Sequence, residues 1–170
     1  MAIDPGTLKA LIKEELASLS DARVLNCIRQ GLVEPRVDLR GWDYGAPGQE
    51  YPCWIVFWDE PTGAEVAYCE HGFGPDSPWG IFITDGVADG QHITMGMDTS
   101  WFTSFLDAVF DSFAVTNLPI WRVFKTGPDW TRVPLSEEGS WDATWEQVYA
   151  LRLSDPAGRY DCDHSISYGR

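Results

Sequence analysis

The sequence predicts an α+β fold in which an N-terminal helix pair precedes a central, mostly antiparallel sheet of about five to six strands. Three observations lead to this expectation. Apolar residues recur at helical spacing near the start of the chain, short apolar runs separated by turn residues fill its middle, and one long helical stripe follows. Strands that cluster in one part of the chain favour α+β over an alternating α/β fold.

Two short helices are expected in residues 1–33. The side chain of Asp4 can cap the first helix, whose apolar residues share one face. These residues are Leu8, Leu11, Ile12, Leu16 and Leu19. Ser20 or Asp21 caps the second helix, which ends near Gly31.

Strands are predicted between residues 36 and 125. The apolar run Cys53–Trp58 is too short for a helix, and the return at Glu65–Cys69 across the turn sequence DEPTG indicates a hairpin. The other expected strands are 36–42, 81–84, 92–95 and 118–125. Short strands joined by tight turns favour antiparallel pairing.

One long aromatic-faced helix is expected at about 98–114. Asp98 caps it, and a wide apolar stripe covers one side. The stripe consists of Trp101, Phe102, Phe105, Leu106, Val109, Phe110 and Phe113. Because such stripes usually form core, we expect this helix to pack on the open face of the sheet.

Residues 126–170 are predicted to comprise a loop, an ambiguous segment and a polar tail. Thr126–Gly139 is rich in turn residues, and Trp141–Leu153 fits a helical turn that leads into a strand. The chain has 170 residues and no internal repeat, so residues 1–170 are expected to form a single domain.

The charge distribution is strongly one-sided. The net charge is −14, and residues 41–121 contain twelve acids but no Lys or Arg. A surface built from this segment would repel nucleic acid and anionic membranes, and would attract a basic protein.

The N-terminus lacks an uninterrupted apolar core after a basic start, and no apolar run is long enough for a transmembrane helix. The four cysteines show no dense spacing of the kind that disulfide-rich domains have. A cytoplasmic protein with reduced thiols is therefore expected.

Candidate chemistry is sparse. The chain contains no nucleophile elbow, Walker loop, dinucleotide fingerprint or metalloprotease helix, so we expect no cofactor and favour a binding protein over an enzyme. The alternative is a small-ligand-binding protein or a hydrolase. Its carboxylate and histidine site would use Glu70, His71 and Asp76 under the Gly/Pro-rich loop 72–80.

Two C-x-H pairs form a further alternative. Cys69 with His71, and Cys162 with His164, supply the ligand types that zinc prefers, although their spacing differs from that of usual structural zinc sites. Convergence of the two pairs would create a metal-stapled structural domain.

The sharper hypothesis concerns partner binding by acids and aromatic anchors. Prolines stiffen the loop GFGPDSPWG, so its aromatic side chains can act as preorganised interface anchors. The expected contact residues are Asp59, Glu60, Glu70, Phe73, Asp76, Trp79, Asp85 and Asp89. The most concrete function is that of a bacterial immunity- or antitoxin-like protein that inhibits a basic toxin or nuclease.

Overall fold

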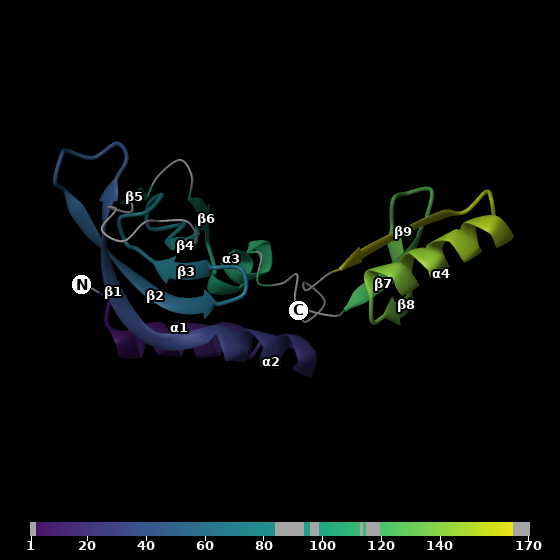
Figure 1. The fold of residues 1–170 in the computed structure, drawn as a ribbon, viewed down its shortest axis with the longest axis horizontal. Coiled ribbons are helices and arrows are strands. Elements are labelled where there is room, and N and C mark those ends of the chain that lie inside the picture. Colours follow the sequence, from purple (N-terminus) through teal and green to yellow (C-terminus); the bar gives the residue numbers. More distant parts are fainter. Residues whose placement is uncertain (1–2, 84–93, 96–98, 113, 115–119, 165–170) are drawn as a thin grey trace. The chain divides into compact units, whose positions relative to one another are not determined.

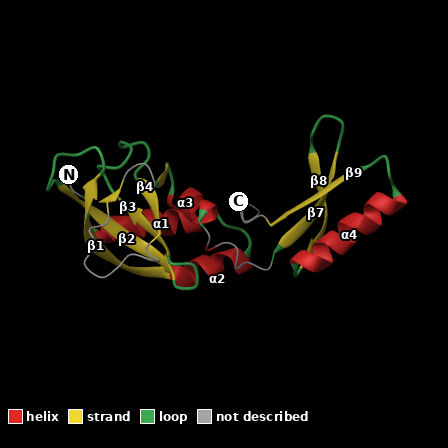
Figure 2. Ribbon diagram, turned by 45° about the horizontal axis from the view of Figure 1, so that its top comes forward, coloured by secondary structure: helices red, strands yellow, loops and turns green. Residues whose placement is uncertain are grey.

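The computed structural model describes residues 3–83, 94–95, 99–112, 114 and 120–164 (Figures 1 and 2). These residues divide into two compact units, one up to Ala114 and one from Ile120 onward, which are described separately. The expectation of a single domain over 1–170 stays a prediction. No helix within the described ranges is long and apolar enough to cross a membrane.

The first unit begins with the expected helix pair, α1 (Pro5–Leu16) and α2 (Ala22–Gly31). The Asp4 carboxylate accepts the backbone N–H groups of Gly6 and Thr7, and Asp21 accepts that of Arg23. These caps satisfy N–H groups that have no partner inside the helix. The prediction of two N-terminal helices is confirmed.

A mostly antiparallel sheet of six strands follows, in the order β5-β1-β2-β3-β4-β6. The strands are β1 (Leu32–Trp42), β2 (Glu50–Asp59), β3 (Ala64–Tyr68), β4 (Trp79–Ile83), β5 (Thr94–Met95) and β6 (Ser100–Phe102). Only the short β1–β5 pairing is parallel among the described strands. The α+β class and the central antiparallel sheet are therefore confirmed.

The two faces of this sheet pack differently. On one face, the rings of Phe57 and Trp79 both lie edge-on to Phe105 of helix α3, at centroid distances of 6.4 and 5.4 Å. Helices α1 and α2 cover the same face (Figure 2). The opposite face carries a second cluster of buried side chains: Cys53, Ile55, Ala67, Cys69, Phe82 and Met95.

The aromatic-faced helix is shorter than the predicted 98–114. Helix α3 spans Phe105–Asp111, and Trp101 and Phe102 belong to strand β6 instead. The Ser104 side chain caps this helix by accepting the Asp107 N–H at 3.1 Å. The Glu15 carboxylate of α1 also accepts the N–H groups of Phe105 and Leu106, at 3.1 and 2.9 Å, and this long-range contact is invisible to a local pattern.

The second unit is a three-stranded antiparallel sheet, in the order β8-β7-β9, covered by one long helix (Figure 1). Its elements are β7 (Trp121–Thr126), β8 (Arg132–Glu138), α4 (Trp141–Ser154) and β9 (Arg159–His164). Val123, Val148 and Tyr160 form its core.

Three predictions for this region were wrong. The strand at 118–125 was assigned to the central sheet, but β7 is the middle strand of the separate one. The predicted loop 126–139 contains β8, and the predicted polar tail contains β9. Residues 141–153 are helical throughout, because the Ser140 side chain caps α4 and its apolar face packs on this second sheet.

Candidate functional site

Two connections lie at the same end of the strands in the six-stranded sheet. The turn 43–49 joins β1 to β2, and the loop 69–78 joins β3 to β4. In an antiparallel meander, alternate connections lie at the same end of the strands. Loop 72–80, which the sequence analysis selected as the binding loop, therefore lies beside the turn 43–49, which it did not select.

Aromatic side chains from both connections form one cluster. The ring of Trp42 lies 6.0 Å from that of Tyr44, 6.0 Å from that of Phe73 and 6.5 Å from that of Trp101. Tyr44 and Phe73 are the outer members, with exposed fractions of 64% and 65%. We call Trp42, Tyr44 and Phe73 the aromatic surface.

Carboxylates flank the aromatic surface. Asp43 precedes Tyr44, and Glu70 and Asp76 lie on either side of Phe73 along the loop; all three are exposed. The Ile3 N–H donates to Glu70 Oε1 at 3.1 Å, which ties that side chain to the N-terminal segment. Because residues 41–121 contain no Lys or Arg, no cation from these connections neutralises the acids.

The loop that carries Phe73 is held by its own backbone and by a close approach. The Cys69 N–H donates to the Pro78 carbonyl at 2.8 Å, and the Gly72 N–H donates to the Cys69 carbonyl at 3.1 Å. A Cβ at Gly72 would stand only 2.2 Å from the Trp101 ring. Phe73 is therefore presented from a fixed backbone, which lowers the entropic cost of using it in binding.

Trp79 does not belong to this surface. It was expected as an exposed anchor, yet its exposed fraction is 3%. Trp79 is the first residue of β4 and faces the helices, where its ring meets Phe105 at 5.4 Å and Tyr68 at 5.1 Å. Side chains alternate between the two faces of the sheet along a strand, and that of Trp79 points to the face covered by the helices, where it enters the core.

Two further predicted contact residues lie at the other end of the strands. Asp59 and Glu60 stand at the turn between β2 and β3, and Asp59 accepts a hydrogen bond from Thr62 Oγ1. Asp85 and Asp89 lie outside the described residues. Of the predicted contact residues that the structure describes, Glu70, Phe73 and Asp76 share the loop between β3 and β4.

Sequence reasoning missed Trp42 and Tyr44 as members of the site. The available signal was the turn-rich stretch after Trp42, where an aromatic residue between Asp43 and Gly45 has little neighbouring core to enter. That Phe73 reaches the same Trp42 ring as Tyr44 depends on long-range strand pairing.

The two C-x-H pairs fall in different units. Cys69 is fully buried, whereas the His71 ring is exposed and stacks on Tyr51 at a centroid distance of 4.8 Å. Cys162 belongs to β9, and the side chain of His164 lies outside the described part. Among the described residues, no three His, Cys, Asp or Glu side chains gather as metal ligands.

Cys69 has a different partner, the Cys53 thiol on the neighbouring strand. The Cys53 thiol donates a hydrogen bond to Cys69, which lowers the pKa of Cys69 and, together with burial, raises that of Cys53. The Cys53 sulfur also lies 3.6 Å from Met95 Sδ. Both thiols are fully buried, so they act as core rather than as nucleophiles open to a substrate.

The alternative hydrolytic site would require a sheltered carboxylate. Glu70, His71 and Asp76 are all exposed, so burial does not prepare any of them for acid–base work. A pocket bounded by described residues lies between α1 and α2 instead.

The second unit carries a further aromatic series. Trp121, Trp141, Trp145 and Tyr149 follow one another with centroid distances of 5.0, 5.4 and 5.6 Å. Three of the four rings repeat every four residues along α4, which places them on one helix face. The helical spacing of Trp141, Trp145 and Tyr149 is visible in the sequence, but the segment was predicted to be partly strand because Tyr149, Leu151 and Leu153 alternate.

No protein-family model, curated protein or solved structure matches the chain.

Proposed function

We propose that this protein binds a basic protein partner through the aromatic surface and its flanking carboxylates. In its most concrete form, the protein is an immunity- or antitoxin-like inhibitor of a bacterial toxin or nuclease. The observation that carries the proposal is the pair Tyr44 and Phe73, two large exposed rings braced on Trp42 within a stretch that has no positive charge.

Rigid aromatic side chains are typical anchors of protein interfaces, because they bury large area at little conformational cost. Phe73 is exposed, but its neighbours Gly72 and Gly74 are only partly so, and the loop backbone is tied at both ends. The anchor is thus preorganised before a partner arrives.

The flanking acids contribute to binding separately from the aromatic anchors. Carboxylates that surround an apolar centre raise the association rate of a basic partner and discriminate against acidic proteins. A toxin or nuclease that grips phosphates has a positive active site, which is the natural complement of such a surface.

Binding is measured against a panel of purified basic nuclease and toxin domains, beginning with the product of any toxin-like gene adjacent to that of this protein. Phe73→Ala is expected to weaken binding by about thirtyfold or more, the usual effect of removing an interface anchor. Glu70→Gln with Asp76→Asn is expected to lower the association rate, and the wild-type rate is expected to fall between about 50 and about 200 mM salt.

Two matched variants serve as controls. Glu60→Gln removes one carboxylate at the other end of the strands, in the turn between β2 and β3. Leu153→Ala truncates an apolar side chain of the second unit; Leu153 is 82% exposed. Neither variant should change binding. An association rate that ignores salt would contradict charge steering, and an unchanged affinity in Phe73→Ala would exclude the aromatic surface as the contact.

A further inference from the structure

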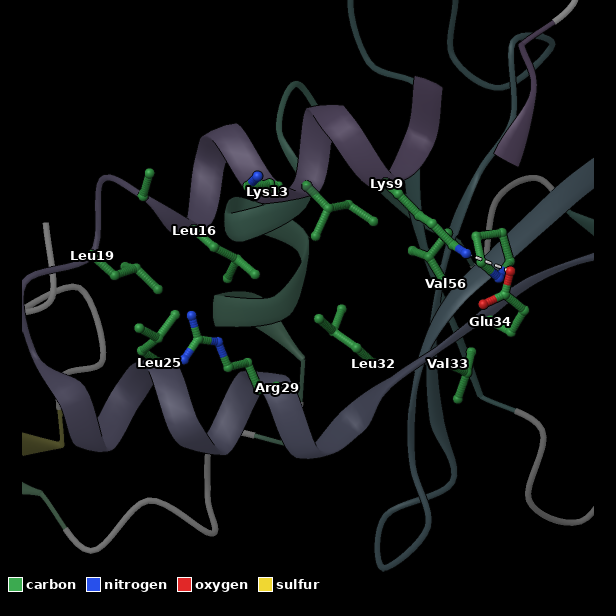
Figure 3. A pocket seen from close by; sticks show the side chains of 13 residues that line it. Lys9, Lys13, Leu16, Leu19, Leu25, Arg29, Leu32, Val33, Glu34 and Val56 are labelled. Carbon is green, nitrogen blue, oxygen red and sulfur yellow. Dashed lines mark hydrogen bonds and ion pairs between the residues drawn. The ribbon is translucent and has the colours of Figure 1, made fainter. Parts of the chain in front are cut away.

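The pocket between α1 and α2 has a mostly apolar lining, opens to solvent and has a volume of about 780 Å³ (Figure 3). Its walls come from the two helices and its floor from the start of β1 and from β2. The apolar side chains that define it include Ile12, Leu16, Leu25, Leu32, Val33 and Val56. Val56 is fully buried, and Ile12 and Leu16 are 5% and 8% exposed, so the apolar surface continues into the core.

Cations stand at the rim of this pocket. Lys9 and Lys13 come from α1, and Arg29 comes from α2. Lys9 pairs with Glu34 at 2.5 Å, and Glu34 is the one acid among the lining residues. In Figure 3 the Arg29 side chain extends from α2 into the gap toward α1, on which Lys13 stands.

The other described Arg residues of the first unit are engaged elsewhere. Arg23 pairs with Asp21, Arg36 with Glu65, and Arg40 with both Asp38 and Glu65. Within the described part of the chain, Lys13 and Arg29 have no acidic partner. Among the described residues of this largely acidic unit, these two cations without an acidic partner therefore flank an apolar pocket.

The volume indicates the kind of occupant. Small-molecule sites usually enclose about 300–1,000 Å³, whereas a three-turn helix about 10 Å across needs about 1,200 Å³. A pocket of about 780 Å³ suits an elongated small molecule better than a peptide helix. An apolar floor below two unpaired cations calls for a ligand with an apolar body and a single anionic end.

We infer that this pocket binds a free fatty acid. The acyl chain lies along Leu16, Leu25 and Leu32, and the carboxylate lies between Lys13 and Arg29. Burial of the chain drives binding, and the two cations select the anionic end and fix its direction. This inference does not depend on the proposed partner, because the pocket uses none of the residues of the aromatic surface.

The test uses the full-length protein and dodecanoate, measured by calorimetry below the concentration at which the ligand aggregates. One dodecanoate is expected per chain. Lys13→Gln with Arg29→Gln should weaken it about tenfold, since each exposed ion pair contributes a few-fold. Dodecyltrimethylammonium, which has the same tail and the opposite charge, should bind at least about tenfold more weakly than dodecanoate.

Two further variants distinguish a real site from general stickiness. Arg23→Gln removes an equal charge from the same helix outside the pocket and should bind dodecanoate normally. Ala17→Trp fills the pocket from an exposed lining position and should abolish binding while leaving the thermal unfolding temperature near that of the wild type.

Several results would overturn the inference. One such result is the absence of saturable dodecanoate binding. Another is that several dodecanoate molecules bind each chain and bind Ala17→Trp as well as the wild type. A third is equal affinity for dodecanoate and dodecyltrimethylammonium. It would also fail if Lys13 and Arg29 were needed only for an acidic amphipathic peptide or for anionic vesicles, with no binding of free dodecanoate.

Discussion

Replacing Glu65 by Gln should destabilise the first unit more than any change at its exposed ion pairs. Glu65 is 4% exposed and accepts hydrogen bonds from Arg36 at 2.6 Å and from Arg40 at 3.1 Å. Arg40 is 1% exposed, lies 4.3 Å above the Phe82 ring and has a buried Nη1 without a hydrogen-bond partner among the described residues.

Removing one partner of a buried ion pair typically costs about 3–5 kcal/mol, because the other charge stays in a poorly solvated place. Asp38 remains at 3.0 Å from Arg40 Nε in the variant, so we expect the lower end, about 3 kcal/mol. Arg40→Met should cost less, about 1–2 kcal/mol, since Glu65 keeps its bond to the half-exposed Arg36.

The double variant Arg40→Met with Glu65→Leu should recover most of the loss, because the two charges that it leaves without these partners, Arg36 and Asp38, are at least partly solvent-exposed and not buried. The readouts are urea unfolding and hydrogen exchange of the β1 and β3 amides, which report on the first unit alone. Lys9→Gln, at a pair whose side chains are 53% and 77% exposed, is the control and should change the unfolding free energy by less than about 1 kcal/mol. A larger loss for Arg40→Met than for Glu65→Gln would refute this reasoning.

Three further predictions follow from local contacts. The side chain of Arg23 lowers the pKa of Asp21 from its ordinary 3.8 to about 2, so its stabilisation is present above pH 3.8 and disappears as the pH falls through about 2. Unfolding free energies measured over this pH range should fall by about 1 kcal/mol in the wild type, a value reduced from the full pKa shift because Arg23 is solvent-exposed. They should show no such loss in Asp21→Asn, whose side chain still caps the helix. Gly31→Ala should destabilise by about 1–3 kcal/mol in thermal unfolding, because the new Cβ would stand 2.3 Å from the Phe57 ring, and an unaffected variant would show that this packing is loose. Burial and the nearby Asp59 raise the pKa of the Cys27 thiol, so its alkylation by iodoacetamide should stay slow at pH 8 and accelerate above pH 9; a rate that levels off below pH 8 would contradict this assignment.

Elements with local signals could be predicted from the sequence. Asp4 and Asp21 are caps that act within three residues, and the Cys53–Trp58 run needs no distant information to be recognised as a strand. The start of α3 was misplaced because Asp98 was taken as the cap in place of Ser104, which accepts the Asp107 N–H. Glu15, 90 residues before Phe105, accepts the Phe105 N–H as well, and local patterns carry no record of that contact.

The candidate site also contains residues that local patterns could predict and residues that they could not. Phe73 and its neighbouring acids were found from loop composition, which is a local property. Trp79 was wrongly placed in the site because its side is decided by the register of β4, where it pairs with Tyr68 and Phe102. A shift of one residue would reverse its direction, so composition alone could not separate anchor from core.

Helix α2 passes into β1 without a connecting loop. Leu32 is at once the residue that caps α2 and the first residue of the strand, with φ −66° and ψ 131°. The segment from Ala22 to Trp42 is therefore continuous from the pocket wall to the Trp42 indole. The pairing of β1 with β2 shifts register between Leu32 and Arg36, directly after the end of α2. By linkage, an effect of pocket occupancy on the aromatic surface would be matched by an equal and reciprocal effect.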